Sequence, residues 1–163
     1  MTIAWARGCK RRSPVGEREI EAAALAALAH GGREMSLSIA IVGDARIANL
    51  HERWFGDPTP TDVISFDLGR EPGPAGELYV SLECALRVAR ARGLDAAREM
   101  LLYVVHGTLH LCGYDDVEPR DRAAMRRAEA RVLAQLAGGP TKPRKSSVAR
   151  TRRAPRRKKT STR

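Results

Sequence analysis

The sequence predicts an α+β fold, in which helices cover one small mixed β-sheet. Candidate helices and strands are interleaved along the chain, but without the strict strand–helix alternation of a parallel α/β fold. Two of the candidate strands are joined by a connection of hairpin-like length, which favours an antiparallel pair. With 163 residues, 43% of them hydrophobic, the chain can bury one core and is too short for two ordinary domains.

Four short segments rich in aliphatic or β-branched residues are predicted to form the strands. The last two segments flank GREPGPAG, a glycine- and proline-rich stretch that is typical of an irregular connection. This arrangement predicts a mixed or antiparallel sheet. The predicted strands cover residues 3–5, 37–42, 62–66 and 77–81.

Capping residues and glycine stops indicate five helices. Ser13 and Pro14 are expected to be the N-cap and the first residue of an alanine-rich helix. Asp95 is expected to cap a helix that ends near Gly113 and whose apolar residues place it in the core. The predicted helices cover residues 14–30, 44–53, 82–92, 96–113 and 119–137.

The formal net charge of +10 is concentrated at the C-terminal end of the chain. Residues 139–163 hold eleven basic residues and no acidic one, so residues 1–138 carry a net charge of only −1. We predict one domain over residues 1–138 and a disordered basic tail over residues 139–163, because the tail has too few apolar side chains to offset the entropy of ordering. Such a tail either attracts RNA phosphates with little sequence preference or only raises solubility.

Cysteine usage and hydropathy bear on the location of the protein. The three cysteines, Cys9, Cys84 and Cys112, form no C-x-x-C pair, which argues against both a disulfide framework and a cysteine-rich zinc module. No apolar run approaches the roughly 20 residues that a membrane span needs, and the N-terminal segment lacks the apolar core of a secretory signal. These features predict a soluble, cytoplasmic protein without a membrane partner.

The strongest candidate site is HGTLHLCGYDD at residues 106–116. His106 and His110 stand at positions i and i+4, so both imidazoles project from one helix face and can reach one ion. Gly113 can break the helix through a left-handed residue and let Asp116 turn back toward the same ion. Two nitrogen ligands and one oxygen ligand, with a fourth position left for water, are typical of catalytic zinc. We therefore predict one Zn²⁺ ion per chain and hydrolase chemistry.

Other interpretations of this segment stay open. Histidines near a helix C-terminus also occur without a metal, because their positive charge complements the helix dipole. Asp115 is a rival ligand, but the spacing of six residues after His110 favours Asp116 and leaves Asp115 to bond the turn or support a ligand. His30 and His51 have no such neighbours in the sequence and are expected on the surface.

At these residues the sequence resembles the YbeY family of bacterial rRNA-maturation endoribonucleases, whose hallmark is H-G-x-L-H-L-x-G-Y-D-H. PTDVISF at residues 60–66 and GELYVSLECA at residues 76–85 also resemble family segments, and the likeness covers about residues 35–135. The resemblance implies metal-dependent cleavage of single-stranded RNA, in maturation of small-subunit ribosomal RNA and in ribosome quality control. It also implies ribosomal RNA and ribosome-associated proteins as partners.

The chain departs from the family pattern at two positions. Asp116 replaces the family's third histidine, which adds a negative charge and a harder ligand. An arginine that the family carries before its P-T-D segment aligns with Phe55, so Arg53, two residues earlier, is a candidate for contacting a substrate phosphate. The alternative for Arg53 is an exposed helix-end arginine without a role in the site. No residue is singled out as a general base.

Two other functions remain open at this point. The pattern H-x-x-x-H-x-x-G-x-x-D resembles that of metzincin peptidases, but those enzymes place a glutamate base directly after the first histidine, where this chain has Gly107. A non-catalytic RNA- or ribosome-binding protein would instead use the basic tail for affinity and the histidines only for stability. A folded His110→Ala variant that no longer cleaves RNA would exclude such a binding protein.

Overall fold

The computed structural model describes residues 1–69 and 75–138. The predicted basic tail, residues 139–163, lies outside them. None of the described helices is long and apolar enough to cross a membrane. The elements of the described residues are β1 (Thr2–Trp5), α1 (Cys9–Arg12), α2 (Glu17–Gly31), β2 (Ser36–Val42), α3 (Asp44–Phe55), β3 (Val63–Asp67), β4 (Ala75–Ser81), α4 (Leu82–Arg92), α5 (Ala96–Leu111) and α6 (Pro119–Ala137).

The four strands form one mixed sheet in the order β1-β2-β4-β3. β2 runs parallel to both of its neighbours, so that Ile39 lies opposite Ile3 on one side and opposite Leu78 on the other. β3 runs antiparallel to β4, with Ser65 opposite Leu78. The α+β class, the mixed sheet and the antiparallel pairing of the last two strands are therefore confirmed.

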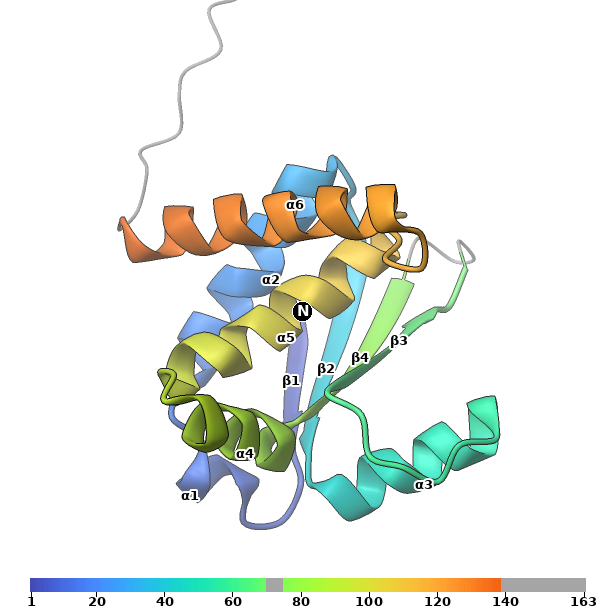
Figure 1. The fold of residues 1–163 in the computed structure, drawn as a ribbon, viewed down its shortest axis with the longest axis vertical. Coiled ribbons are helices and arrows are strands. Elements are labelled where there is room, and N and C mark those ends of the chain that lie inside the picture. The colour runs from blue at the N-terminus through green and yellow to red at the C-terminus, as the bar shows by residue number, and fades with distance from the viewer. Residues whose placement is uncertain (70–74, 139–163) are drawn as a thin grey trace, which may run out of the picture.

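The helices pack on both faces of this sheet. α5 crosses one face in Figure 1 and contacts β3 and β4, while α2 and α6 pack against α5. Ile39, Leu78 and Val104 are fully buried in the core between these helices and the sheet. α3 packs on β3 and β4 through a second, smaller cluster, which includes Ile47 and Ile64. The sheet thus supports α5 and α3 from its two faces.

The structure corrects the prediction near the N-terminus. The second helix begins at Glu17 rather than at Pro14, because the Glu19 carboxylate accepts a hydrogen bond from the backbone N–H of Gly16 at 3.0 Å and caps the helix there. The hydroxyl of Ser13 is not the N-cap of this helix; it bonds within a local turn instead. A one-turn helix, α1, precedes this turn and was not predicted.

Candidate metal centre

Helix α5 carries both candidate histidines and is fixed at each end. The Asp95 side chain accepts a hydrogen bond from the backbone N–H of Ala97 at 2.9 Å, so it caps the helix as predicted. Beyond Leu111 the chain leaves the helix, and Gly113 has a φ of +91°, in the left-handed region. This turn directs the following residues back along the helix face and brings Asp116 to the histidines.

Gly107 lets α5 approach the sheet between the two histidines. A Cβ atom at this position would lie 2.7 Å from Val63 Cγ2 and 3.0 Å from Ser65 Oγ, both closer than ordinary contacts. The Ser65 hydroxyl donates a hydrogen bond to the Gly107 carbonyl oxygen at 3.0 Å. The close approach and this bond hold the histidine-bearing turn of α5 against β3.

His106, His110 and Asp116 come together at the end of α5. The two imidazole Nε2 atoms are 3.0 Å apart. The Asp116 carboxylate oxygens lie 3.7 Å from Nε2 of His106 and 3.9 Å from Nε2 of His110. One potential ligand atom from each residue lies within 4.8 Å of the others, and all three residues are partly exposed. One ion could therefore contact all three side chains and still be reached by solvent.

The other ring nitrogen of each histidine already has a partner. Nδ1 of His110 lies 3.0 Å from the Tyr114 carbonyl oxygen, which can only accept a hydrogen bond, so Nδ1 carries the proton. Nδ1 of His106 lies 2.6 Å from Oε1 of Glu129 and donates to that carboxylate. With the proton of each ring on Nδ1, the two Nε2 lone pairs face the same point. A cation or a proton between them would relieve their repulsion, so the donor set fits a metal ion.

The electrostatic surroundings of His106 favour a positive charge. Burial by itself lowers the pKa of His106, but the hydrogen bond and the charge of Glu129, with the charges of Asp62 and Asp116, outweigh it and raise the pKa above its usual value. The same carboxylates would favour a bound cation. The negative surroundings thus suit a metal at Nε2 of His106.

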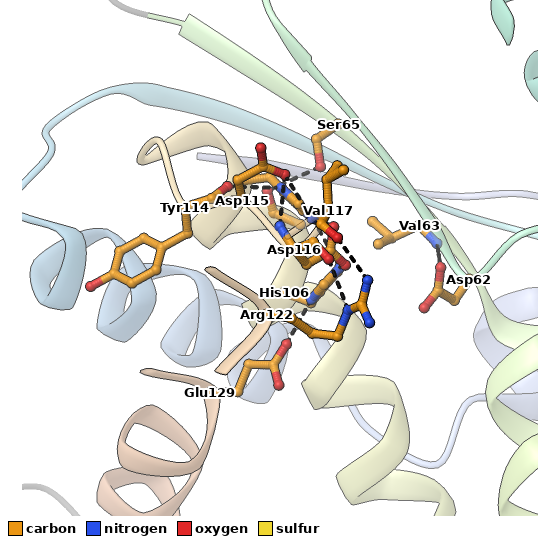
Figure 2. Close-up of polar contacts among 12 residues, drawn as sticks. Asp62, Val63, Ser65, His106, Tyr114, Asp115, Asp116, Val117, Arg122 and Glu129 are labelled. Atoms are coloured by element: carbon orange, nitrogen blue, oxygen red, sulfur yellow. Dashed lines mark hydrogen bonds and ion pairs between the residues drawn. The ribbon is translucent and has the colours of Figure 1, made fainter. Parts of the chain in front are cut away.

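The turn that carries Asp116 is held by Asp115 and Arg122 (Figure 2). The Asp115 carboxylate accepts hydrogen bonds from the backbone N–H groups of Asp116, at 2.7 Å, and Val117, at 3.2 Å. From α6, the Arg122 guanidinium donates to the carbonyl oxygens of the same two residues at 2.9 and 2.8 Å. The expectation that Asp115 bonds the turn is therefore confirmed, and Arg122 adds a clamp from a neighbouring helix.

A cleft of about 340 Å³ opens in front of the histidine pair. It is lined by His51, Phe55, Thr61, Val63, Ile64, Ser65, His106 and His110. A second pocket, of about 420 Å³, shares Thr61 and His106 with the first and extends to Glu129 and Arg92. The structure corrects the prediction for His51, which was expected on the surface with no site residues near it. The His51 side chain is only 22% exposed and lines the cleft with the candidate ligands.

Sequence reasoning missed Glu129 and Arg122, since both reach the site from α6. A signal for Glu129 was present: it follows the buried residues Met125 and Ala128 and precedes the buried Val132 on α6, where a carboxylate needs a partner. The predicted phosphate contact, Arg53, lies on the exposed surface of α3 with its guanidinium 5.9 Å from the centre of the Trp54 ring. It is not among the residues that line the cleft, and its role stays a prediction.

Comparisons with known proteins agree with the motif. The family model described as endoribonuclease YbeY matches residues 12–137. A Rhodopirellula baltica relative named endoribonuclease YbeY is 45% identical over 119 residues, which are 71% of this chain and 61% of the relative. A Beutenbergia cavernae relative of the same name is 36% identical over 141 residues, or 78% of this chain and 94% of the relative.

Coverage and structural similarity complete the comparison. The chain spans about three fifths of the length of several of these relatives, for example 58% of one from an Anaeromyxobacter species. The solution structure of a Thermotoga maritima protein is also similar, with a TM-score of 0.58 and 25% identity over 85% of this chain and 90% of that one. Because the family model matches residues 12–137 and relatives of that name are 36% and 45% identical over more than two thirds of the sequence, this chain belongs to the YbeY family.

Proposed function

We propose that this chain is a metal-dependent endoribonuclease that cleaves single-stranded RNA, with one Zn²⁺ ion held by His106, His110 and Asp116. The observation that carries the proposal is the convergence of two imidazole Nε2 atoms, oriented through their Nδ1 partners, with the carboxylate of Asp116, whose backbone Arg122 holds. RNA as the substrate is supported by the name that the relatives share, endoribonuclease YbeY.

The donor set favours zinc in a catalytic role. Imidazole nitrogens suit zinc, and three protein ligands leave a coordination position for water, whereas structural zinc sites are usually closed by four. When bound, zinc supplies Lewis acidity toward a phosphodiester and lowers the pKa of water. The residues of the chain would orient the ligands: Glu129 and the Tyr114 carbonyl hold the Nδ1 protons of the histidines, and Arg122 holds the backbone at Asp116.

The shape around the site suits a linear strand. The two pockets meet at Thr61 and His106, so a chain lying across both would pass the histidine pair. By its family likeness the protein would act in the cytoplasm on small-subunit ribosomal RNA, in its maturation and in ribosome quality control, beside ribosome-associated proteins. In this proposal residues 1–138 form the metallohydrolase domain, residues 139–163 form a disordered basic tail that adds affinity for RNA phosphates, and Arg53 adds a phosphate contact from the exposed surface of α3.

A metallopeptidase is the weaker alternative. Metzincin-type enzymes need a glutamate base directly after the first histidine, and position 107 is glycine here. A larger residue at this position would collide with Val63 Cγ2, since even a Cβ atom would lie 2.7 Å from it. The packing of α5 on β3 is thus incompatible with that base.

The test compares three full-length proteins: wild type, His110→Ala and a control, Asp121→Asn, which removes an exposed carboxylate from the first turn of α6. Circular dichroism confirms folding, elemental analysis gives the zinc content, and labelled single-stranded RNA, duplex RNA and casein serve as substrates. We expect wild type and control to bind zinc and cleave single-stranded RNA, and His110→Ala to lose both properties.

Each of the other outcomes refutes a different part of the proposal. If His110→Ala cleaves RNA at the wild-type rate in metal-depleted buffer, the metal is not needed. If wild type binds RNA but never cleaves it, the protein is a binding protein. Digestion of casein with intact RNA would instead support a peptidase.

A further inference from the structure

Exposed aromatic side chains gather at the C-terminal end of α3. Trp54 and Phe55 are each 60% exposed, and they are the large aromatic side chains left mostly uncovered within residues 1–69 and 75–138. Exposed rings of this size lose the stabilisation that burial would give them, so a pair of them on one helix end suggests a ligand surface. Phe55 also lines the cleft that holds both candidate histidine ligands, whereas Trp54 lies beside it on the helix.

The Phe55 ring lies against a histidine that is tied to the loop after α3. It contacts the His51 ring with 5.5 Å between the ring centres. Nδ1 of His51 lies 2.8 Å from the carbonyl oxygen of Thr59, and the Thr59 backbone N–H and hydroxyl both donate to Asp57, at 2.8 and 2.7 Å. These bonds tie the loop after α3 back onto the helix. Phe55 therefore presents an exposed aromatic face at the cleft, beside a histidine ring that is itself hydrogen-bonded to the following loop.

We propose that Phe55 is a stacking platform for a nucleobase of the RNA strand, next to the phosphate that lies at His106 and His110. The inference rests on the proposed function, which it deepens. A nucleotide places a flat aromatic ring beside a phosphate, and the cleft places an aromatic face beside a candidate cation site. Trp54 follows Arg53 at the same helix end but lies outside the cleft, and the Arg53 guanidinium, 5.9 Å from the Trp54 ring centre, adds a positive charge there. Aromatic faces combined with cations are the usual means of binding single strands without sequence preference.

The experiment measures binding of fluorescein-labelled eight-nucleotide RNAs to the full-length protein by anisotropy, read before cleavage is detectable. In one RNA set, a single abasic ribose is moved along the strand. The proteins are wild type, Phe55→Leu, Phe55→Trp and Leu94→Ala, the last being an exposed apolar residue outside the cleft. Phe55→Leu keeps an apolar side chain but removes the aromatic face, while Phe55→Trp keeps such a face.

We expect Phe55→Leu to raise the Kd for intact RNA roughly 5- to 150-fold, the range that follows from loss of one stacked base. Phe55→Trp and Leu94→Ala should bind like wild type. At one position along the strand, an abasic ribose should weaken binding to wild type and leave binding to Phe55→Leu unchanged, because the stacking partner is already missing.

Three results would overturn the proposal. The first is that Phe55→Leu binds RNA as tightly as wild type. The second is that Phe55→Trp weakens binding as much as Phe55→Leu does. The third is that the abasic ribose weakens binding by the same factor in wild type and Phe55→Leu at every position. The last result would mean that the leucine acts through packing against His51 rather than through a base. If wild type binds RNA through Phe55 but does not cleave it, the proposed function fails while the platform stands; if wild type cleaves and Phe55→Leu binds normally, only the platform fails.

Discussion

Replacing Glu129 by glutamine removes a negative charge from His106 while keeping the shape of the side chain. The Glu129 carboxylate lies 2.6 Å from Nδ1 of His106, and the two side chains are only 15% and 20% exposed. The Glu129 carboxylate accepts a hydrogen bond from the Nδ1–H group of His106, which leaves the Nε2 lone pair for a metal. A glutamine oxygen can still accept this hydrogen bond, but its NH₂ group can also donate, which would favour the tautomer with a protonated Nε2.

The size of the effect follows from this geometry. Because both side chains are largely shielded from solvent, the charge is weakly screened, and a hydrogen bond to a charged group contributes about 1.5–3 kcal/mol. Loss of such a partner to a metal-ligating histidine lowers metal affinity roughly 10- to 100-fold. We expect Glu129→Gln to raise the zinc Kd about tenfold, and Glu129→Ala, which also loses the acceptor, to raise it nearer to 100-fold.

The assay is competition for zinc between the protein and a chromophoric chelator at fixed pH. Asp121→Asn is the matched control, because it removes one negative charge from the same helix at an exposed position. If Glu129→Gln binds zinc as tightly as this control, Glu129 does not orient a ligand, and the reasoning from the 2.6 Å contact is wrong.

Three further predictions concern stability and RNA binding. Gly107→Ala should lower the free energy of unfolding by about 1–2 kcal/mol, because overpacking against β3 exceeds the gain in helix propensity; a more stable variant in urea would contradict the close approach. Hydrogen bonds from Arg12 and from the backbone of Asp44 lower the pKa of Glu83. The stabilisation by that carboxylate should be present above its unfolded-state value of about 4.3 and be lost as pH falls through the folded-state pKa. Near neutral pH, wild type should therefore exceed Glu83→Gln in unfolding free energy by about 1 kcal/mol after screening by solvent, and this difference should vanish in acid. A difference that persists in acid would show that the Glu83 charge is not its source. Removing residues 139–163 should weaken RNA binding and flatten its dependence on salt, as measured by anisotropy, with zinc content unchanged; equal salt slopes would leave the tail only a solubilising role.

The parts of the site that could be predicted from sequence are local in the chain. The spacing of His106 and His110 fixes their common helix face, and Gly113 marks the turn that returns Asp116. The strands could also be predicted from the sequence, because alternating aliphatic residues and a glycine-rich connection are local signals. Local geometry therefore sufficed to bring the candidate ligands together and to give the mixed sheet.

The parts that could not be predicted depend on packing between distant segments. Glu129 and Arg122 reach the site only because α6 packs on α5, and His51 and Phe55 line the cleft only because α3 packs on β3 and β4. The start of α2 shows a competition between local signals, since the carboxylate of Glu19 caps the helix in place of Ser13. No spacing rule determines these outcomes, because each depends on the free energy of the packed structure.

X-ray absorption at the zinc K-edge of the purified full-length protein tests most directly whether two imidazoles and one carboxylate share a cation. We predict bound zinc with two imidazole nitrogens at about 2.0–2.1 Å and a carboxylate oxygen at about 2.0–2.2 Å in wild type, and no bound zinc in His110→Ala. A spectrum dominated by sulfur at about 2.3 Å, or one that His110→Ala leaves unchanged, would contradict the account.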